Sequence, residues 1–174
     1  MMRRLLNRPM AIAIVALPLL LAGSFSIFSQ GTTANKDIPV RDLLKLTGKV
    51  VSEAKTTRPS GDLNLTGYRV EELQLPRTFT TEIRGQQVAT DKAWRVTVQG
   101  GPFPVRALPA VVWIDDQIVG NGIENETLSQ ITAITFDSSL IREGGVIAIS
   151  YGEDKDSRRK LPQTLQLKGE GENQ

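Results

Sequence analysis

The sequence predicts an all-β domain, a two-layer β-sandwich, that follows a single apolar N-terminal segment. Short stretches in which hydrophobic and polar residues alternate predict strands, and clusters of Gly, Pro, Asp, Asn and Ser separate them at intervals of about ten residues. After the N-terminal segment there is no long stretch with the periodicity of an amphipathic helix. The chain of 174 residues is long enough for one such domain with its own core.

The N-terminal segment, residues 1–29, begins with three arginines and continues as an almost uninterrupted apolar stretch over residues 10–29. This stretch is just long enough to cross a bilayer as a helix. The arginines precede it, so the positive-inside rule predicts a cytoplasmic N-terminus and an extracytoplasmic remainder. A signal peptide cleaved near residues 22–26 and an uncleaved membrane anchor both fit, and the lack of an A-x-A cleavage motif favours the anchor. Both imply export, and the anchor would bind the membrane through residues 10–29.

The chain contains no histidine and no cysteine. It therefore has no Ser-His-Asp or Cys-His catalytic relay, no imidazole ligand for zinc, no disulfide and no cysteine-ligated iron–sulfur cluster. Nor does it contain a phosphate-binding loop, a dinucleotide-binding glycine pattern or a G-x-S-x-G motif. We expect no catalytic residues, no cofactor and no metal. An exported chain that lacks cysteine also favours a bacterial cell envelope over a eukaryotic secretory pathway.

The net charge of the whole chain is +2, but residues 1–29 contribute three arginines and no acidic residue. Without them, 18 of the 21 basic residues remain against 19 acidic residues, a net charge of −1. A nearly neutral domain has no overall positive charge to attract phosphate groups. We therefore expect no nucleic-acid partner.

The residues between the apolar segment and the first predicted strand form a polar linker that includes a short helix. Asp37 is a candidate N-cap, Pro39 suits a first helical turn and Gly48 is a candidate stop, although a first strand fits this stretch as well. A polar stretch also ends the sequence and predicts disorder. The predicted organisation is a signal peptide or anchor at 1–29, a linker with a short helix at 30–46, the β-sandwich domain at 47–168 and a disordered tail at 169–174.

The predicted strands are short and rich in β-branched and aromatic residues. In the stretch 94–99, Trp94, Val96 and Val98 alternate with polar residues, which predicts one buried face. In the stretch 146–151 both alternating sets are mostly apolar, which predicts an inner strand covered on both faces. We expect about seven to nine strands, drawn from the stretches 49–54, 67–75, 77–83, 93–99, 110–114, 117–120, 131–136, 146–152 and 163–167, the last of them an edge strand.

The stretch ITFDSSLIREGGVIAISYG, residues 134–152, predicts two strands joined by a short crossover. Asp137 would cap the turn, and Leu140 would fill the core beneath it. This pattern resembles the strand–crossover–strand corner of immunoglobulin-like sandwiches, in particular the TIG-type domains of bacterial extracytoplasmic proteins. The resemblance covers about residues 90–167. It implies an all-β, immunoglobulin-like β-sandwich preceded by one N-terminal transmembrane or signal helix, and it implies no function.

The densest cluster of polar side chains lies in the stretch VVWIDDQIVGNGIENET, residues 111–127. Asp115 and Asp116 separate two strand-like stretches, and because aspartate tolerates turn conformations we expect them at a hairpin tip. Asn121 followed by Gly122 predicts the end of the second strand. We expect the adjacent tip residues to point apart into water, so we interpret these carboxylates as structural rather than catalytic or metal-binding.

The loop GEDKDSRRK, residues 152–160, contains a D-x-D pattern at Asp154 and Asp156. A calcium-binding loop would need a further carboxylate or amide, a central glycine and a terminal glutamate, and none of these follows. We interpret the loop as a solvated hairpin turn. Its basic residues would be available to an acidic partner or to acidic lipid headgroups.

The stretch GGPFPVRALPA, residues 100–110, predicts a rigid connection at one end of the sandwich, because its prolines cannot donate hydrogen bonds to a sheet. Rigid, apolar, exposed loops make good binding surfaces. The two tryptophans, Trp94 and Trp113, lie within strand patterns, and we expect them in the core. The predicted partner surface consists of Phe103, Pro104, Arg106, Arg158, Arg159 and Lys160.

The predicted function is a non-catalytic binding or structural role at the bacterial cell envelope, as an accessory subunit or interaction module that contacts an envelope protein. Two alternatives stay open. A ligand-binding module for glycans or calcium would require exposed aromatic residues or a carboxylate cage. A noncanonical hydrolase would require an acidic pair from separate strands, such as Asp137 or Glu143 placed against Glu82 or Asp91 in a cleft.

Overall fold

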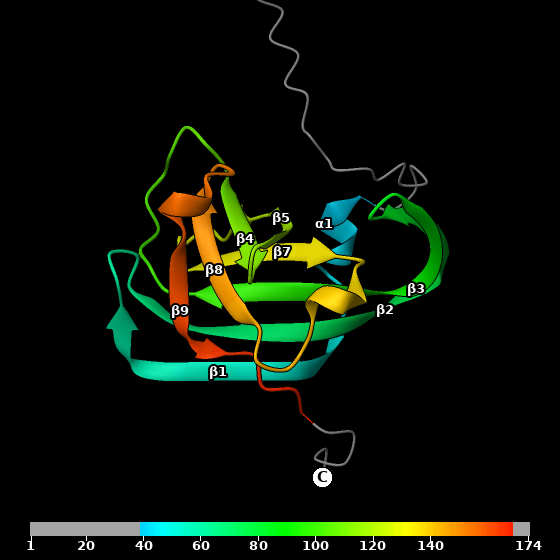
Figure 1. The fold of residues 1–174 in the computed structure, drawn as a ribbon, viewed down its shortest axis with the longest axis horizontal. Coiled ribbons are helices and arrows are strands. Elements are labelled where there is room, and N and C mark those ends of the chain that lie inside the picture. The colour runs from blue at the N-terminus through cyan, green and yellow to red at the C-terminus, as the bar shows by residue number, and fades with distance from the viewer. Residues whose placement is uncertain (1–38, 169–174) are drawn as a thin grey trace, which may run out of the picture.

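The computed structural model describes residues 39–168, which form two antiparallel β-sheets packed face to face (Figure 1). The elements are α1 (Val40–Leu43), β1 (Gly48–Ser60), β2 (Leu65–Ile83), β3 (Gln86–Gln99), β4 (Ala110–Ile114), β5 (Gln117–Asn121), β6 (Ile123–Glu124), β7 (Gln130–Thr135), η1 (Ser138–Leu140), β8 (Val146–Tyr151), η2 (Lys155–Ser157) and β9 (Arg159–Thr164). One sheet has the order β1-β2-β3-β7-β6 and the other the order β5-β4-β8-β9. This arrangement confirms the predicted all-β sandwich. The last strand lies at a sheet edge as predicted, but it covers 159–164 and not 163–167.

Strand β2 joins two stretches that the sequence divides at Pro76. The predicted strands 67–75 and 77–83 are therefore wrong as separate elements, because β2 is one strand of 19 residues. Proline ends most strands since it has no N–H to donate. Here Pro76 lies in a β-bulge, where the pairing of β2 with β3 shifts in register between Gln74 and Phe79, so the strand continues past the proline. Beyond the bulge the two strands continue as a curled arm beside α1 (Figure 1, right).

The main core fills the space between the two sheets and follows the alternation that the sequence predicts. In β3, Val96 and Val98 are fully buried, while the residues between them face the other way. In β8, Ile147 and Ile149 belong to the same core cluster. The alternate side chains of β8 are buried as well, so this strand is covered on both faces as expected.

The crossover between β7 and β8 has the predicted form. The side chain of Asp137 caps η1 by accepting hydrogen bonds from the backbone N–H (3.0 Å) and the hydroxyl (2.6 Å) of Ser139. Leu140 is buried in the main core beneath this turn. Gly144 then adopts a left-handed φ of 77°, which an ordinary side chain would disfavour. This corner is compatible with an immunoglobulin-like fold.

A second hydrophobic cluster lies on the outer face of the five-stranded sheet, beneath α1. Leu43 of α1 packs there against residues such as Leu73, which alternate with main-core residues along β2. The predicted linker at 30–46 thus contains a helix of four residues, Val40–Leu43, and not a strand there. Gly48 was predicted to end this helix, but it begins β1. A side chain at this position would place its Cβ atom 2.7 Å from the Cβ atom of Glu71. The candidate cap Asp37 lies outside the described residues.

Two links tie the edges of the sheets together. On one side only Gly122 separates β5, which pairs in the four-stranded sheet, from β6, which pairs with β7 in the other. On the opposite side the chain after β9 reaches β1. There the Lys168 N–H donates to the Val51 carbonyl at 2.8 Å, and the Ser52 hydroxyl donates to the Gln166 carbonyl at 2.8 Å. The segment after β9 is therefore joined to β1.

The predicted signal peptide or anchor at 1–29, the linker residues 30–38 and the predicted tail at 169–174 lie outside the described residues. Within residues 39–168 no helix is long and apolar enough to cross a membrane. The membrane segment stays a prediction from the sequence.

Candidate functional site

The two aspartates of the polar cluster lie at the tip of the β4–β5 hairpin, as predicted. β4 ends at Ile114 and β5 begins at Gln117, so Asp115 and Asp116 form a two-residue turn. Asp115 has a left-handed φ of 54°, which tight hairpin turns commonly require, and aspartate is one of the residues that adopt it most readily. The pair is a turn, which is the interpretation that the sequence favours.

Asp115 also links the hairpin to two neighbouring segments. One side-chain oxygen accepts a hydrogen bond from the Val146 N–H (2.9 Å), and the other accepts one from the Arg142 guanidinium (2.6 Å). Its backbone carbonyl accepts a hydrogen bond from the Arg158 guanidinium at 2.7 Å. The expectation that both aspartates point into water is therefore wrong for Asp115, whose side chain is 30% exposed, and right for Asp116, at 76%.

The hydrogen bonds to Asp115 make the stability of the domain depend on pH. The Val146 N–H first, and the Arg142 guanidinium second, hold the pKa of Asp115 below its usual value. Such a group stabilises the fold above its unfolded pKa of about 3.9, and this contribution is lost as the pH falls through the lower folded pKa. We expect Asp115→Asn to lower the free energy of unfolding by about 1 kcal/mol at pH 7, and this difference from wild type to shrink in acid.

Urea unfolding of wild type and variant at steps between pH 7 and pH 2 measures that difference. Glu53→Gln, in β1 and exposed, is a control that should show no such convergence. A difference that stays constant down to pH 2 would contradict the assigned role of the Asp115 carboxylate.

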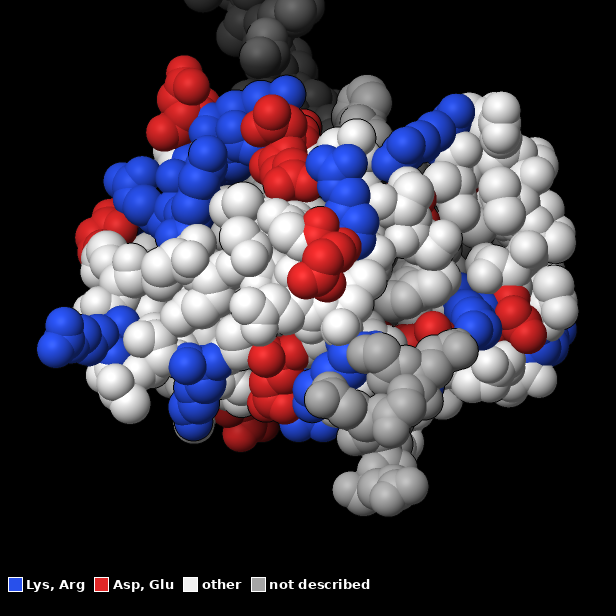
Figure 2. Space-filling view, turned by 60° about the horizontal axis from the view of Figure 1, so that its bottom comes forward, with Lys and Arg blue, Asp and Glu red and all other residues white. Residues whose placement is uncertain are grey.

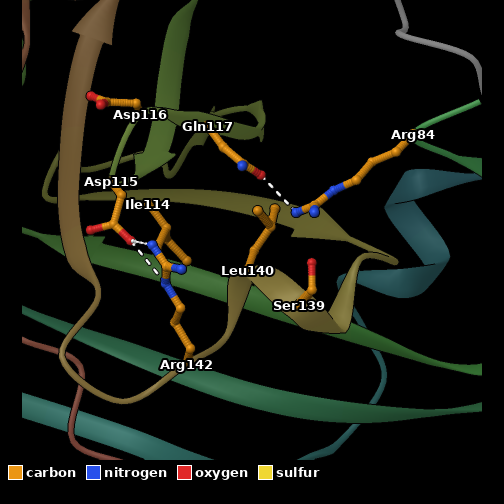
Figure 3. A pocket seen from close by; sticks show the side chains of 8 residues that line it. All are labelled: Arg84, Ile114, Asp115, Asp116, Gln117, Ser139, Leu140 and Arg142. Carbon is orange, nitrogen blue, oxygen red and sulfur yellow. Dashed lines mark hydrogen bonds and ion pairs between the residues drawn. The ribbon is translucent and has the colours of Figure 1, made fainter.

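An open hollow of about 370 Å³ lies beside this turn, between the β4–β5 tip, the β2–β3 tip and the η1 segment (Figure 3). Arg84, at the β2–β3 tip, donates hydrogen bonds to the Asp137 carboxylate (2.9 Å) and to the side-chain oxygen of Gln117 (2.7 Å). Sequence reasoning missed this hollow because three distant segments form it. It is lined by Arg84, Ile114, Asp115, Asp116, Gln117, Ser139, Leu140 and Arg142.

Arg158 is not available to a partner, which corrects the prediction. Its side chain is only 11% exposed, and its guanidinium lies 5.1 Å from the centre of the Trp113 ring. It also donates a hydrogen bond to the Asp116 carboxylate at 2.8 Å. Trp113 is buried, but in a small cluster on the outer face of the four-stranded sheet and not in the main core. Trp94 is half-buried against the main core.

Phe103 is also wrong as a partner-surface residue, because it is 1% exposed and belongs to the main core. Its backbone N–H donates to the Leu128 carbonyl at 2.7 Å, and the Gly101 N–H donates to the Leu63 carbonyl at 3.0 Å. These bonds hold the β3–β4 loop between two other turns at one end of the sandwich. The aromatic ring therefore enters the core from that end, and Pro104 is half-buried next to it.

The β3–β4 loop instead exposes two aliphatic side chains that sequence reasoning did not select. Val105 is 81% exposed and Leu108 is 59% exposed. Between them Arg106, exposed as expected, places its guanidinium 5.1 Å from the centre of the Tyr151 ring. The loop stands out beside the β8–β9 turn (Figure 1, upper left). The sequence feature that could have identified these exposed residues is the pair of aliphatic residues on either side of an arginine in a proline-rich loop.

The structure brings Arg159 to the same end, but not Lys160. Arg159 donates to the Asp62 carboxylate of the β1–β2 turn at 2.8 Å, and this bond, with a smaller contribution from the charge of Arg106, lowers the pKa of Asp62. Lys160 is the next residue of β9 and faces the outer side of its sheet. Charged side chains of both signs gather toward this end (Figure 2, upper left). We define the end surface as Pro104, Val105, Arg106, Leu108, Tyr151 and Arg159.

Asp154, Glu143 and Asp91, three of the carboxylates considered for calcium binding or hydrolysis, have separate partners. Asp154 caps η2 by accepting a hydrogen bond from the Asp156 N–H. Glu143 accepts one from the Leu167 N–H (2.6 Å), and Asp91 accepts one from the Gln74 side chain (3.1 Å). Among residues 39–168 no three acidic side chains are grouped so that they could hold a metal ion.

Comparisons of the chain with family models, curated proteins and solved structures found no match. Function is therefore inferred from the surfaces of the molecule.

Proposed function

We propose that this protein has a non-catalytic binding or structural role at the bacterial cell envelope, as an accessory subunit or interaction module. Residues 10–29 would tether it to the cytoplasmic membrane or direct its export, and the β-sandwich domain would lie on the outer side. The end surface would contact an envelope protein. We also propose that the sandwich belongs to the immunoglobulin-like folds of the TIG type, a proposal that the Leu140 corner supports.

The exposed aliphatic pair in a fixed loop is the observation that carries this proposal. Val105 and Leu108 expose apolar surface that a partner would remove from water. The loop is held at its start by Phe103 in the core and at its end by a hydrogen bond from the Gly152 N–H to the Pro109 carbonyl (2.9 Å). Because the loop is already ordered, binding would cost little conformational entropy.

Tyr151 adds a second observation. Its hydroxyl oxygen is buried and has no hydrogen-bond partner among the described residues, and burial raises its pKa. Buried polar groups without a partner are uncommon in folded proteins. A small shift of the covering loop on binding would let a partner or a water molecule satisfy this group.

The edges formed by β1 and β9 are less suitable for a partner than the end surface. Strand β1 carries Lys49, Lys55 and Pro59 along its length, and β9 carries Pro162. Charged residues and prolines on edge strands oppose pairing with a strand of another chain. Contact through the end loops is therefore favoured over the addition of a strand to β1 or β9.

Site-specific cross-linking in membranes of the source cell tests the proposal. A photoreactive residue is placed at position 108 in the full chain, and in a second variant at Gln87, an exposed position of β3 in the arm. We expect one envelope protein to be cross-linked from position 108 and not from position 87. Adding Val105→Asp to the first variant should abolish this cross-link without changing expression or unfolding.

Equal capture from both positions, or capture that survives Val105→Asp, would contradict the proposed surface. Mass spectrometry of the same samples shows whether the peptide containing residues 1–29 is still attached, which distinguishes an anchor from a cleaved signal. If the protein occurs only in released form and captures no protein, the accessory-subunit proposal fails.

A further inference from the structure

We propose that the hollow between Arg84 and Arg142 binds a carboxylate that carries a small aliphatic group, such as a peptide C-terminus or a short-chain acid. This inference is independent of the end surface, because the hollow lies at the opposite end of β4. The β3–β4 loop leads into that strand at Ala110, whereas the hollow adjoins its last residue, Ile114.

The two guanidinium groups keep unused hydrogen-bond donors. Each arginine has five N–H groups. Arg84 uses its Nε and Nη2 atoms for Asp137 and Gln117, and Arg142 uses its Nε and Nη2 atoms for Asp115. Both Nη1 groups are left without a partner among the described residues. Figure 3 shows the two guanidinium groups reaching into the hollow from different sides, with the Leu140 side chain between them.

The hollow also offers an apolar floor. Ile114 and Leu140 line it and are otherwise buried, so the little surface that they expose faces the hollow. A carboxylate could accept hydrogen bonds from the Nη1 groups while its aliphatic group covers this floor. Because Asp115 and Asp137 already balance the two arginines, we expect weak binding, with a Kd on the order of 1 mM.

The backbone at Arg84 is the second, independent observation. Arg84 and Gly85 form the two-residue turn between β2 and β3, and Arg84 has a left-handed φ of 53°. Asn, Asp and Gly are the residues that favour this conformation, and other residues adopt it at a cost. Backbone strain of this kind is often found at functional sites. The turn itself gives no reason for an arginine here, whereas its side chain reaches the hollow.

Because Arg84 has this strained backbone conformation, it can be replaced by a residue that favours the turn, so an effect on carboxylate binding can be measured without a loss of stability. Arg84→Asn suits the turn, so we expect the hairpin to be retained and carboxylate binding to weaken roughly ten-fold. Arg142→Gln should weaken binding to a similar degree, and its side chain is exposed enough for the fold to tolerate the change. Arg58→Gln, which removes an exposed arginine of β1, is the matched control and should bind like wild type.

The experiment uses the full chain, labelled with ¹⁵N in a nonionic detergent, and follows the arginine Nε–Hε signals. The probes are 3-methylbutanoate, N-acetyl-alanyl-leucine with a free C-terminus, its C-terminal amide, and sulfate. We expect saturable shifts of the Arg84 and Arg142 signals with one or both acids, none with the amide, and at least about ten-fold weaker binding of sulfate. Tighter binding of the peptide acid identifies a chain terminus as the ligand class, and tighter binding of 3-methylbutanoate identifies a small acid.

Three results would each overturn the proposal. The first is the lack of a saturable shift up to about 20 mM of either acid. The second is an amide or sulfate that binds as well as the acids. The third is unchanged binding in Arg84→Asn and Arg142→Gln, which would leave both arginines as cross-links between the sheets and nothing more.

Discussion

Replacing Arg95 by alanine is expected to lower the free energy of unfolding by about 3–5 kcal/mol. Arg95 and Glu71 form an ion pair on the outer face of the five-stranded sheet, with Nε–Oε2 and Nη2–Oε2 distances of 2.8 and 2.7 Å. Their side chains are only 14% and 10% exposed. Without Arg95 the Glu71 carboxylate would lose its main partner in a poorly solvated place, which costs far more than an exposed pair contributes.

Arg95 also fixes the chain that leads out of α1. Its Nη1 donates to the carbonyls of Leu44 and Leu46 at 2.8 and 3.1 Å. These carbonyls follow a helix of four residues, which is too short to be stable by itself. We therefore expect α1 to detach from the sheet in the variant before the sheets themselves unfold.

Urea unfolding measured by circular dichroism gives the free energies, and hydrogen exchange at Leu44 and Leu46 reports on α1. Arg69→Ala is the matched control, because Arg69 is 41% exposed and approaches the same glutamate only to 3.3 Å. Its expected cost is below about 1 kcal/mol. If the Arg95→Ala protein were as stable as the Arg69→Ala protein, the ion pair between Arg95 and Glu71 would contribute no more to stability than an exposed ion pair.

Phe103→Ala is the second change with a large expected effect, a loss of about 3–5 kcal/mol in the free energy of unfolding. The ring fills the end of the main core, so alanine would leave a cavity there. Phe103→Leu keeps most of the volume and should cost less than about 1.5 kcal/mol. Because Phe103 anchors the β3–β4 loop, alanine should also abolish the cross-link from position 108.

The contrast with Val105 makes this prediction specific. Val105→Ser alters a side chain that is 81% exposed, so its unfolding curve should match that of wild type. Denaturant unfolding of Phe103→Ala, Phe103→Leu and Val105→Ser, together with cross-linking from position 108, distinguishes a residue that anchors the loop from one that contacts the partner. If Phe103→Ala unfolds like Val105→Ser, the ring does not hold the loop.

Local alternation in the sequence was sufficient to predict most strands and the class of the fold. Val96 and Val98 face the core because neighbouring residues in a strand point to opposite sides, a rule that needs only local information. Pro76 shows the limit of such rules. A proline ends a strand unless a partner strand shifts its register around it, and that shift depends on β3, which is distant in sequence.

The sequence selected the loop that forms the end surface but only half of its residues, since Pro104, Arg106 and Arg159 were selected and Val105, Leu108 and Tyr151 were not. The sequence located the β3–β4 loop and the DD turn, but it could not show which way their neighbours point. Phe103 turns inward because two carbonyls from other turns hold the loop at the end of the core. Arg158 turns inward because Trp113 and two aspartate oxygens attract it. Both choices depend on groups that only the fold brings together.

The link between β1 and the end of the chain has a consequence for how the domain is made. The hydrogen bond from Ser52 to Gln166 joins residues 114 positions apart. Contacts of such long range form late, since a large loop must close before they contribute. A nascent chain that has been synthesised only as far as β9 therefore leaves β1 without this contact. We therefore expect β1 to gain these hydrogen-bond partners only after residues 166–168 have been synthesised.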